Sequence, residues 1–112
     1  MKSFKKFLTQ IIIEEIPSSI KSNVLTILKD IENFIFESIK DNPYIEFVYF
    51  DDIIFENEVC FDMVENIQSL YEKINIDKDI SDIGDMIYRF IKQKSKSLNI
   101  KKYKNNMIIT LK

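Results

Sequence analysis

Apolar residues in the first forty positions recur every three or four residues, which is the spacing of one face of a helix. The first such stretch covers residues 3–15, and Pro17 disfavours helical geometry just after it. The second covers residues 20–40, where the apolar positions are Ile20, Val24, Ile27, Leu28, Ile31, Phe34, Ile35 and Ile39. The pattern predicts two amphipathic helices, with the second at the centre of the core.

The spacing changes after Pro43. Residues 44–50 are aromatic and β-branched and alternate between two faces, which predicts a strand. Residues 53–55 and 59–61 are two shorter strand candidates. Asp51-Asp52 and residues 56–58 are the turns between them, since Asp and Asn accept turn geometry.

Helical spacing returns after Asp62. Asp62 and Glu65 are placed as in a capping box, which predicts a helix over 63–75. A further apolar stripe predicts a helix over 80–98. Residues 100–104 and 107–111 flank Asn105-Asn106, which favours a β-hairpin turn. Together these patterns predict a single α+β domain over residues 1–112, with about four helices, a small antiparallel sheet and a C-terminal β-hairpin.

Several residue types needed for catalysis are rare. The chain has no His, and Cys60 and Gly84 are its only Cys and Gly. Ser-His and Cys-His nucleophiles, internal disulfides, thiolate zinc sites and glycine-rich phosphate loops are therefore excluded. Carboxylates alone could still form a glycosidase pair or a Mg²⁺ site, but a small domain with one Gly has little loop to build a cleft. We expect a protein that is not an enzyme and has no metal or cofactor.

The apolar stretches are too short for a membrane span. None approaches 18 uncharged residues, so we expect no contact with a membrane. The Lys-rich start followed by residues 11–13 has the outline of a signal peptide. However, Glu14 and Glu15 interrupt it and no small-residue cleavage site follows, so we expect a cytoplasmic protein.

The net charge of −2 hides a strong asymmetry. Residues 41–85 hold thirteen acidic and two basic side chains, whereas residues 86–112 hold eight basic and no acidic ones. One explanation is that the two blocks pair with each other inside the domain, although exposed pairs contribute little to stability. The other explanation is that one of the blocks binds a partner.

The densest acidic stretch lies beside aromatic residues. Carboxylates crowded into short strands and turns suit a basic protein partner, because opposite charge speeds association and aromatic side chains anchor the contact. We therefore predict a partner-binding surface made of Tyr49, Asp51, Asp52, Phe55, Glu56, Glu58 and Asp62.

In size, acidity and lack of catalytic residues, the chain resembles the immunity proteins of bacterial toxins, antitoxins and phage-encoded inhibitors. This resemblance is one of type and rests on no motif. It implies an inhibitor that neutralises a basic toxin or nuclease by covering its active or nucleic-acid-binding surface.

The C-terminal half supports an alternative. The predicted order of helix, strand, two helices and hairpin resembles a winged helix-turn-helix, with residues 70–83 at its core and Ile74, Ile76, Ile80, Ile83 and Ile87 buried. This resemblance implies nucleic-acid binding through Arg89, Lys92, Lys94, Lys96, Lys101, Lys102 and Lys104. The sequence departs from the family in two respects. Asp79, Asp82 and Asp85 lie where a recognition helix enters the groove, and bulky Tyr71 replaces a small residue.

Overall fold

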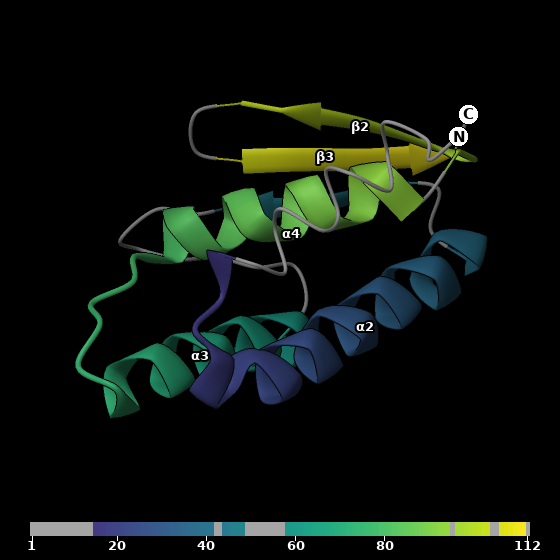
Figure 1. The fold of residues 1–112 in the computed structure, drawn as a ribbon. Helices are drawn as coiled ribbons and strands as arrows, with labels where there is room; N and C mark the ends of the chain where they lie inside the picture. The colour runs from purple at the N-terminus through teal and green to yellow at the C-terminus, as the bar shows by residue number, and fades with distance from the viewer. Residues whose placement is uncertain (1–14, 42–43, 49–57, 95, 104–105, 112) are drawn as a thin grey trace, which may run out of the picture.

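The fold combines helices with one small antiparallel sheet (Figure 1). The computed structural model describes residues 15–41, 44–48, 58–94, 96–103 and 106–111. Along the chain these form α2 (Ser18–Asp41), β1 (Tyr44–Val48), α3 (Glu58–Lys73), α4 (Ile80–Lys94), β2 (Leu98–Lys102) and β3 (Asn106–Leu111). The predicted α+β class is confirmed for these residues, which contain three helices and three strands. The helix predicted over 3–15 lies outside them, apart from Glu15.

The sheet has the strand order β1-β3-β2, and both pairings are antiparallel. Ile109 pairs with Ile45 of β1 and Ile100 of β2, and this row packs on the core. Since side chains alternate between the two faces of a strand, the next row of Glu46, Ile108 and Lys101 lies on the opposite face. The sheet thus has one apolar face and one mixed face.

Helix α4 lies between the sheet and the pair formed by α2 and α3 (Figure 1). It is therefore buried over much of its circumference and contributes Ile83, Met86, Ile87, Phe90 and Ile91 to the core. This central position leaves one stripe of α4 at the surface, and the polar side chains of the helix lie along it.

The helix predicted over residues 20–40 is confirmed as α2, which begins directly after Pro17, at Ser18. Its predicted place at the centre of the fold is taken by α4, which contacts both the sheet and the other helices. Six of the eight apolar positions of α2 are fully buried, and the exposed fraction of Ile31 is 0%. Ile27 and Phe34 pack on the edge of the core and are partly buried. Only a helix places all of these apolar positions on one face, which is why the pattern alone predicts this element.

The region before α3 differs from the prediction. Residues 59–61, predicted as a strand, lie in the first turns of α3, and Asp62 lies inside this helix instead of capping it. A three-residue apolar run fits a helix as well as a strand, so helical packing further along decides its conformation. Of the other predicted strands, residues 53–55 lie outside the described residues, and the strand over 44–50 is described as β1 up to Val48.

Helix α4 ends four residues earlier than predicted, at Lys94. Leu98 is buried as the predicted helix requires, but it is the first residue of β2 and pairs with Leu111. Strands β2 and β3 pair as the predicted hairpin requires. Ile76, predicted to be buried, has an exposed fraction of 38% because it lies in the turn between α3 and α4.

Candidate functional site

Most of the predicted acidic surface cannot be placed. Tyr49, Asp51, Asp52, Phe55 and Glu56 lie outside the described residues. Glu58 is the first residue of α3, and Asp62 is exposed one turn later on the same helix. The gathering of all seven residues on one surface therefore remains a prediction.

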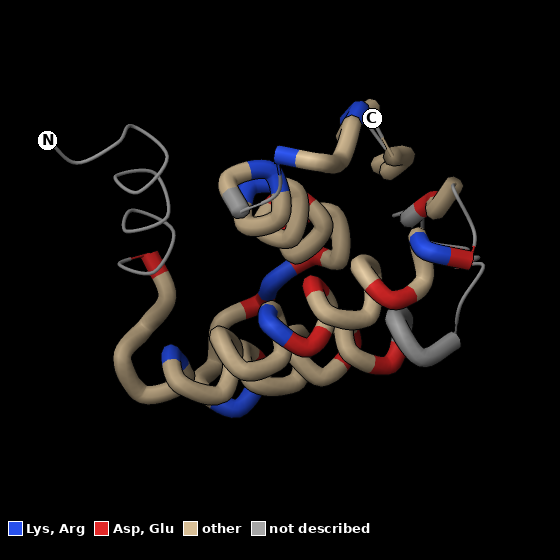
Figure 2. Tube along the Cα trace, turned by 90° about the vertical axis from the view of Figure 1, so that its right-hand side faces the viewer, with Lys and Arg blue, Asp and Glu red and all other residues tan. Residues whose placement is uncertain are grey.

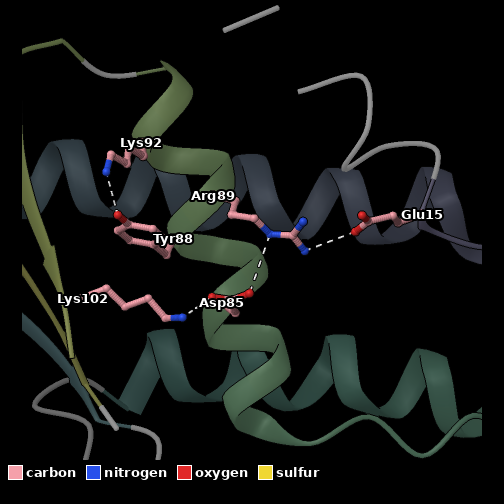
Figure 3. A network of polar contacts seen from close by, with 6 residues as sticks. All are labelled: Glu15, Asp85, Tyr88, Arg89, Lys92 and Lys102. Atoms are coloured by element: carbon pink, nitrogen blue, oxygen red, sulfur yellow. Dashed lines mark hydrogen bonds and ion pairs between the residues drawn. The ribbon is translucent and has the colours of Figure 1, made fainter. Parts of the chain in front are cut away.

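The basic residues of the C-terminal quarter do not form a single patch. Blue segments, which mark Lys and Arg, are spread over several elements of the trace (Figure 2). Arg89 and Lys92 come from α4, and Lys102 of β2 forms an ion pair with Asp85 of this helix (Figure 3). Lys101 lies on the opposite face of β2, and Lys96 is exposed between α4 and β2. The side chain of Lys94 is not described, and Lys104 lies outside the described residues.

Three cations and a carboxylate meet on the exposed side of α4. We call Asp85, Tyr88, Arg89, Lys92 and Lys102 the α4 cluster (Figure 3). Asp85 forms ion pairs with Lys102 and Arg89, with 3.8 Å between Arg89 Nε and Asp85 Oδ2. Arg89 Nη2 also donates a hydrogen bond of 3.2 Å to Oε2 of Glu15. Side chains from three distant parts of the sequence therefore share one surface.

The charged side chains of this cluster are partly exposed to solvent. Arg89, Asp85 and Lys102 are each exposed over a third or more of their side chains. Ion pairs of this kind contribute about 0–1 kcal/mol to folding. Arg89 Nε is itself buried and has no hydrogen-bond partner among the described residues. The fold thus gains little from the cluster, which makes it a candidate for binding.

Tyr88 occupies the middle of this surface, between the two lysines (Figure 3). Lys92 Nζ donates a hydrogen bond of 2.7 Å to the Tyr88 hydroxyl and is 5.1 Å from the ring centroid, so it lies at the hydroxyl end of the ring. Lys102 Nζ is 5.8 Å from the same centroid. The hydroxyl accepts the bond from Lys92, so its own proton is available to another acceptor.

The turn before α4 fixes the orientation of this helix. Asn75 has a φ of 61°, and Ile76 and Asn75 donate backbone hydrogen bonds to Tyr71 and Glu72, which closes α3 in a Schellman motif. Gln68 of α3 then donates a 3.0 Å hydrogen bond to the carbonyl of Lys78. These bonds tie the start of α4 to α3.

Tyr71 is buried beneath this turn, so the large residue that departs from the helix-turn-helix pattern is part of the core. Burial raises the pKa of its hydroxyl above the usual 10.0, and the carboxylate of Glu15 raises it further. Tyr71 is therefore neutral at physiological pH, as its core position requires.

A shallow groove runs between α2 and α3, with a volume of about 400 Å³. Its only charged lining residue is Lys73; the others are Asn23, Thr26, Ile27, Asn66, Ser69 and Leu70. Neither the groove nor the rest of the described chain brings together three His, Cys, Asp or Glu side chains that could hold a metal ion. No helix within the described ranges is long and apolar enough to cross a membrane.

No family model matches the chain, and no curated protein or solved structure is significantly similar to it.

Sequence analysis identified the basic residues of the α4 cluster but not their partners. Glu15 is 74 residues from Arg89, and Asp85 is 17 residues from Lys102. The contact between Tyr88 and Lys92 is predictable from the sequence, because residues four apart are neighbours on a helix. The sequence pattern does not distinguish Tyr88 from a core residue, because an aromatic residue in an amphipathic helix is usually part of the core.

Proposed function

We propose that this protein is a cytoplasmic nucleic-acid-binding protein of the winged helix-turn-helix type that contacts the sugar-phosphate backbone. The observation that carries this proposal is the arrangement of α2, β1, α3, α4 and the β2-β3 hairpin, with β3 between β1 and β2. This order resembles that of a winged helix-turn-helix, and in helix-turn-helix proteins the second helix of the turn faces nucleic acid.

The position of the lysines supports the same proposal. Lys92 of α4 and Lys102 of the hairpin reach the exposed stripe of α4, which is the surface that such domains turn toward nucleic acid. Phosphate contacts by Lys and Arg supply most of the affinity of sequence-independent binding. Because neither side chain is needed to stabilise the core, both are available for this role.

The acidic residues at the start of α4 limit the mode of binding. Asp79 and Asp82 are exposed on the turn and first residues that would enter a groove, where they repel phosphate. Asp85 differs from them because Lys102 and Arg89 neutralise it. The proposed contacts are therefore made by the middle of α4 and the hairpin, and the N-terminal turn of α4 reads no bases.

The inhibitor hypothesis remains a prediction. It depends on Asp51, Asp52 and their neighbours, which lie outside the described residues, and it needs no nucleic-acid contact. The two functions are distinguished by whether the purified protein binds nucleic acid.

The test is fluorescence anisotropy with a labelled random-sequence DNA duplex over a series of salt concentrations. We expect a dissociation constant of about 10⁻⁴–10⁻⁶ M at physiological salt, and a logarithm of the binding constant that falls linearly with the logarithm of salt concentration. The double variant Lys92→Gln, Lys102→Gln should bind more weakly and with a shallower salt dependence.

The matched control is Lys21→Gln, Lys29→Gln, which removes the same charge from α2. It should change binding much less than the variant of the α4 cluster. Equal losses in the two double variants would indicate unspecific attraction to net charge. Absence of binding at low salt would refute the proposal and favour the inhibitor hypothesis.

A further inference from the structure

One face of the sheet is not covered by any described helix. The helices of the described ranges lie together on the other side of the sheet (Figures 1 and 2). Ile45, Ile100 and Ile109 face these helices and belong to the core or pack against it. The alternate positions face away, and we call them the outer sheet face: Tyr44, Glu46, Asn99, Lys101, Ile108 and Thr110. Tyr44 has an exposed fraction of 45%, and none of the six residues is fully buried.

Two opposite charges flank the centre of the outer sheet face. The strand register places Glu46 of β1 and Lys101 of β2 directly opposite Ile108 of β3, one on each side. Neighbouring strands are about 4.8 Å apart, so the two charged residues lie at equal distances from Ile108. Glu46 accepts a hydrogen bond of 3.1 Å from the Tyr44 hydroxyl, whereas Lys101 forms no ion pair within the described part of the chain. The face therefore presents an acid, an apolar residue and a base in one row.

We propose that the outer sheet face binds a second copy of this chain in a symmetric dimer. A twofold axis parallel to the strands, above Ile108, places β1 of one protomer over β2 of its partner. Glu46 of each protomer then faces Lys101 of the partner subunit, and the two Ile108 side chains meet at the centre. Sheets that pack face to face lie about 10 Å apart, a gap that a Glu and a Lys side chain span together.

The neighbouring row fits the same arrangement. It consists of Tyr44, Thr110 and Asn99, again with the β3 residue in the middle. The axis brings Thr110 to Thr110 of the partner subunit and Tyr44 over Asn99 of the partner subunit. The exposed ring of Tyr44 thus becomes buried, and aromatic side chains are enriched at interfaces.

The charges select this orientation and this occupant. A twofold axis across the strands would place Glu46 over Glu46 and Lys101 over Lys101, and like charges in contact are costly. Nucleic acid fits this face poorly because Glu46, at the edge of the row, repels phosphate. The dimer therefore leaves the α4 cluster free and does not depend on the proposed function.

The size of the face determines how stable the dimer is. Strands β1 and β2 have five residues each and β3 has six. From the strand and residue spacings, the face measures about 15 Å on a side. This area is small compared with that of permanent dimers, so we expect a weak dimer that forms at high protein concentration.

The experiment is analytical ultracentrifugation of the full chain without nucleic acid, from about 10 μM to 1 mM, where weak dimers form. The dimer fraction should rise over this range. Lys101→Glu and Glu46→Lys should each weaken dimerisation at least about tenfold, because each places like charges in contact. Combining both changes exchanges the two charges, keeps the net charge at −2 and should restore the dimer.

The matched control is Lys29→Glu, which makes the same change of charge on the exposed face of α2. It should leave dimerisation unchanged. Equal losses for Lys29→Glu and Lys101→Glu would overturn the proposal, as would a monomer at every concentration. Loss of the dimer in both single variants without recovery in the exchanged variant would overturn the pairing of Glu46 with Lys101. If Glu46→Lys does not fold, as judged by circular dichroism, the comparison of Lys101→Glu with Lys29→Glu decides.

Discussion

Helices α2 and α4 both bury an apolar stripe, but their exposed faces differ. Among the described residues, the polar side-chain contacts of α2 are local: Lys40 pairs with Glu37, and Thr26 donates to the carbonyl of Ser22. The exposed face of α4 instead meets Glu15 and Lys102 from other parts of the chain. The surface of α2 solubilises a core helix, whereas the surface of α4 assembles charges that folding does not require. This contrast supports the proposal that α4, and not α2, contacts a partner.

Breaking the buried face of α2 should have the largest effect. Ile31 is fully buried at the centre of this helix. Ile31→Ala should lower the free energy of unfolding by about 2–5 kcal/mol through lost burial and the cavity left behind. Urea denaturation measures this loss, and Lys29→Ala on the exposed face is the control, with an expected loss below about 0.5 kcal/mol. A loss that small for Ile31→Ala would contradict the assigned core.

A change in the turn that leads into α4 should have an intermediate effect. Asn75 has a positive φ, which is unfavourable for residues with a Cβ other than Asn and Asp. Asn75→Ala should cost about 1 kcal/mol, whereas Asn75→Gly should cost nothing or stabilise the protein, since Gly accepts this conformation. Thermal melts of both variants test the assignment. Equal losses would show that the Asn side chain matters instead of its backbone conformation.

The smallest effect on folding should come from the α4 cluster. A double-mutant cycle with Asp85→Asn and Lys102→Gln should give a coupling free energy of about 0.2–1 kcal/mol, because both side chains are exposed to solvent. Chemical denaturation of the four proteins measures this coupling. A value well above 1 kcal/mol would mean that the pair serves the fold, and the contrast between α2 and α4 would then disappear.

Elements with an extended, regular pattern were predictable from the sequence. The eight apolar positions of residues 20–40 and the alternation after Pro43 each have one simple explanation. The first is confirmed as α2, and the second is confirmed as β1 as far as Val48. Shorter patterns failed. The apolar residues at 59–61 fit a strand or a helix, and Leu98 fits the end of α4 or the start of β2. At such positions tertiary packing decides between equal local alternatives.

The candidate site was only half predictable. The basic residues of α4 and β2 are visible in the sequence, but their grouping depends on how the hairpin packs against the helix. Lys101 and Lys102 are adjacent residues of the same type, so the sequence does not distinguish them. The strand register places Lys102 beside Asp85 and Lys101 on the opposite face of the sheet. The sequence likewise does not show that Asp85 is neutralised, and from the sequence alone its charge predicts repulsion of phosphate.

The middle strand of the sheet has a consequence for how the protein is made. Strand β3 is synthesised after both of the strands that it joins, and about sixty residues separate it from β1. At a translation rate of 5–20 residues per second, roughly 3–12 seconds pass between the synthesis of β1 and that of its partner strand. An unpaired aromatic and β-branched strand can pair with other nascent chains. Glu46, at the centre of β1, places a charge inside this aggregation-prone segment. Such a charge disfavours pairing with other chains until β3 has been synthesised.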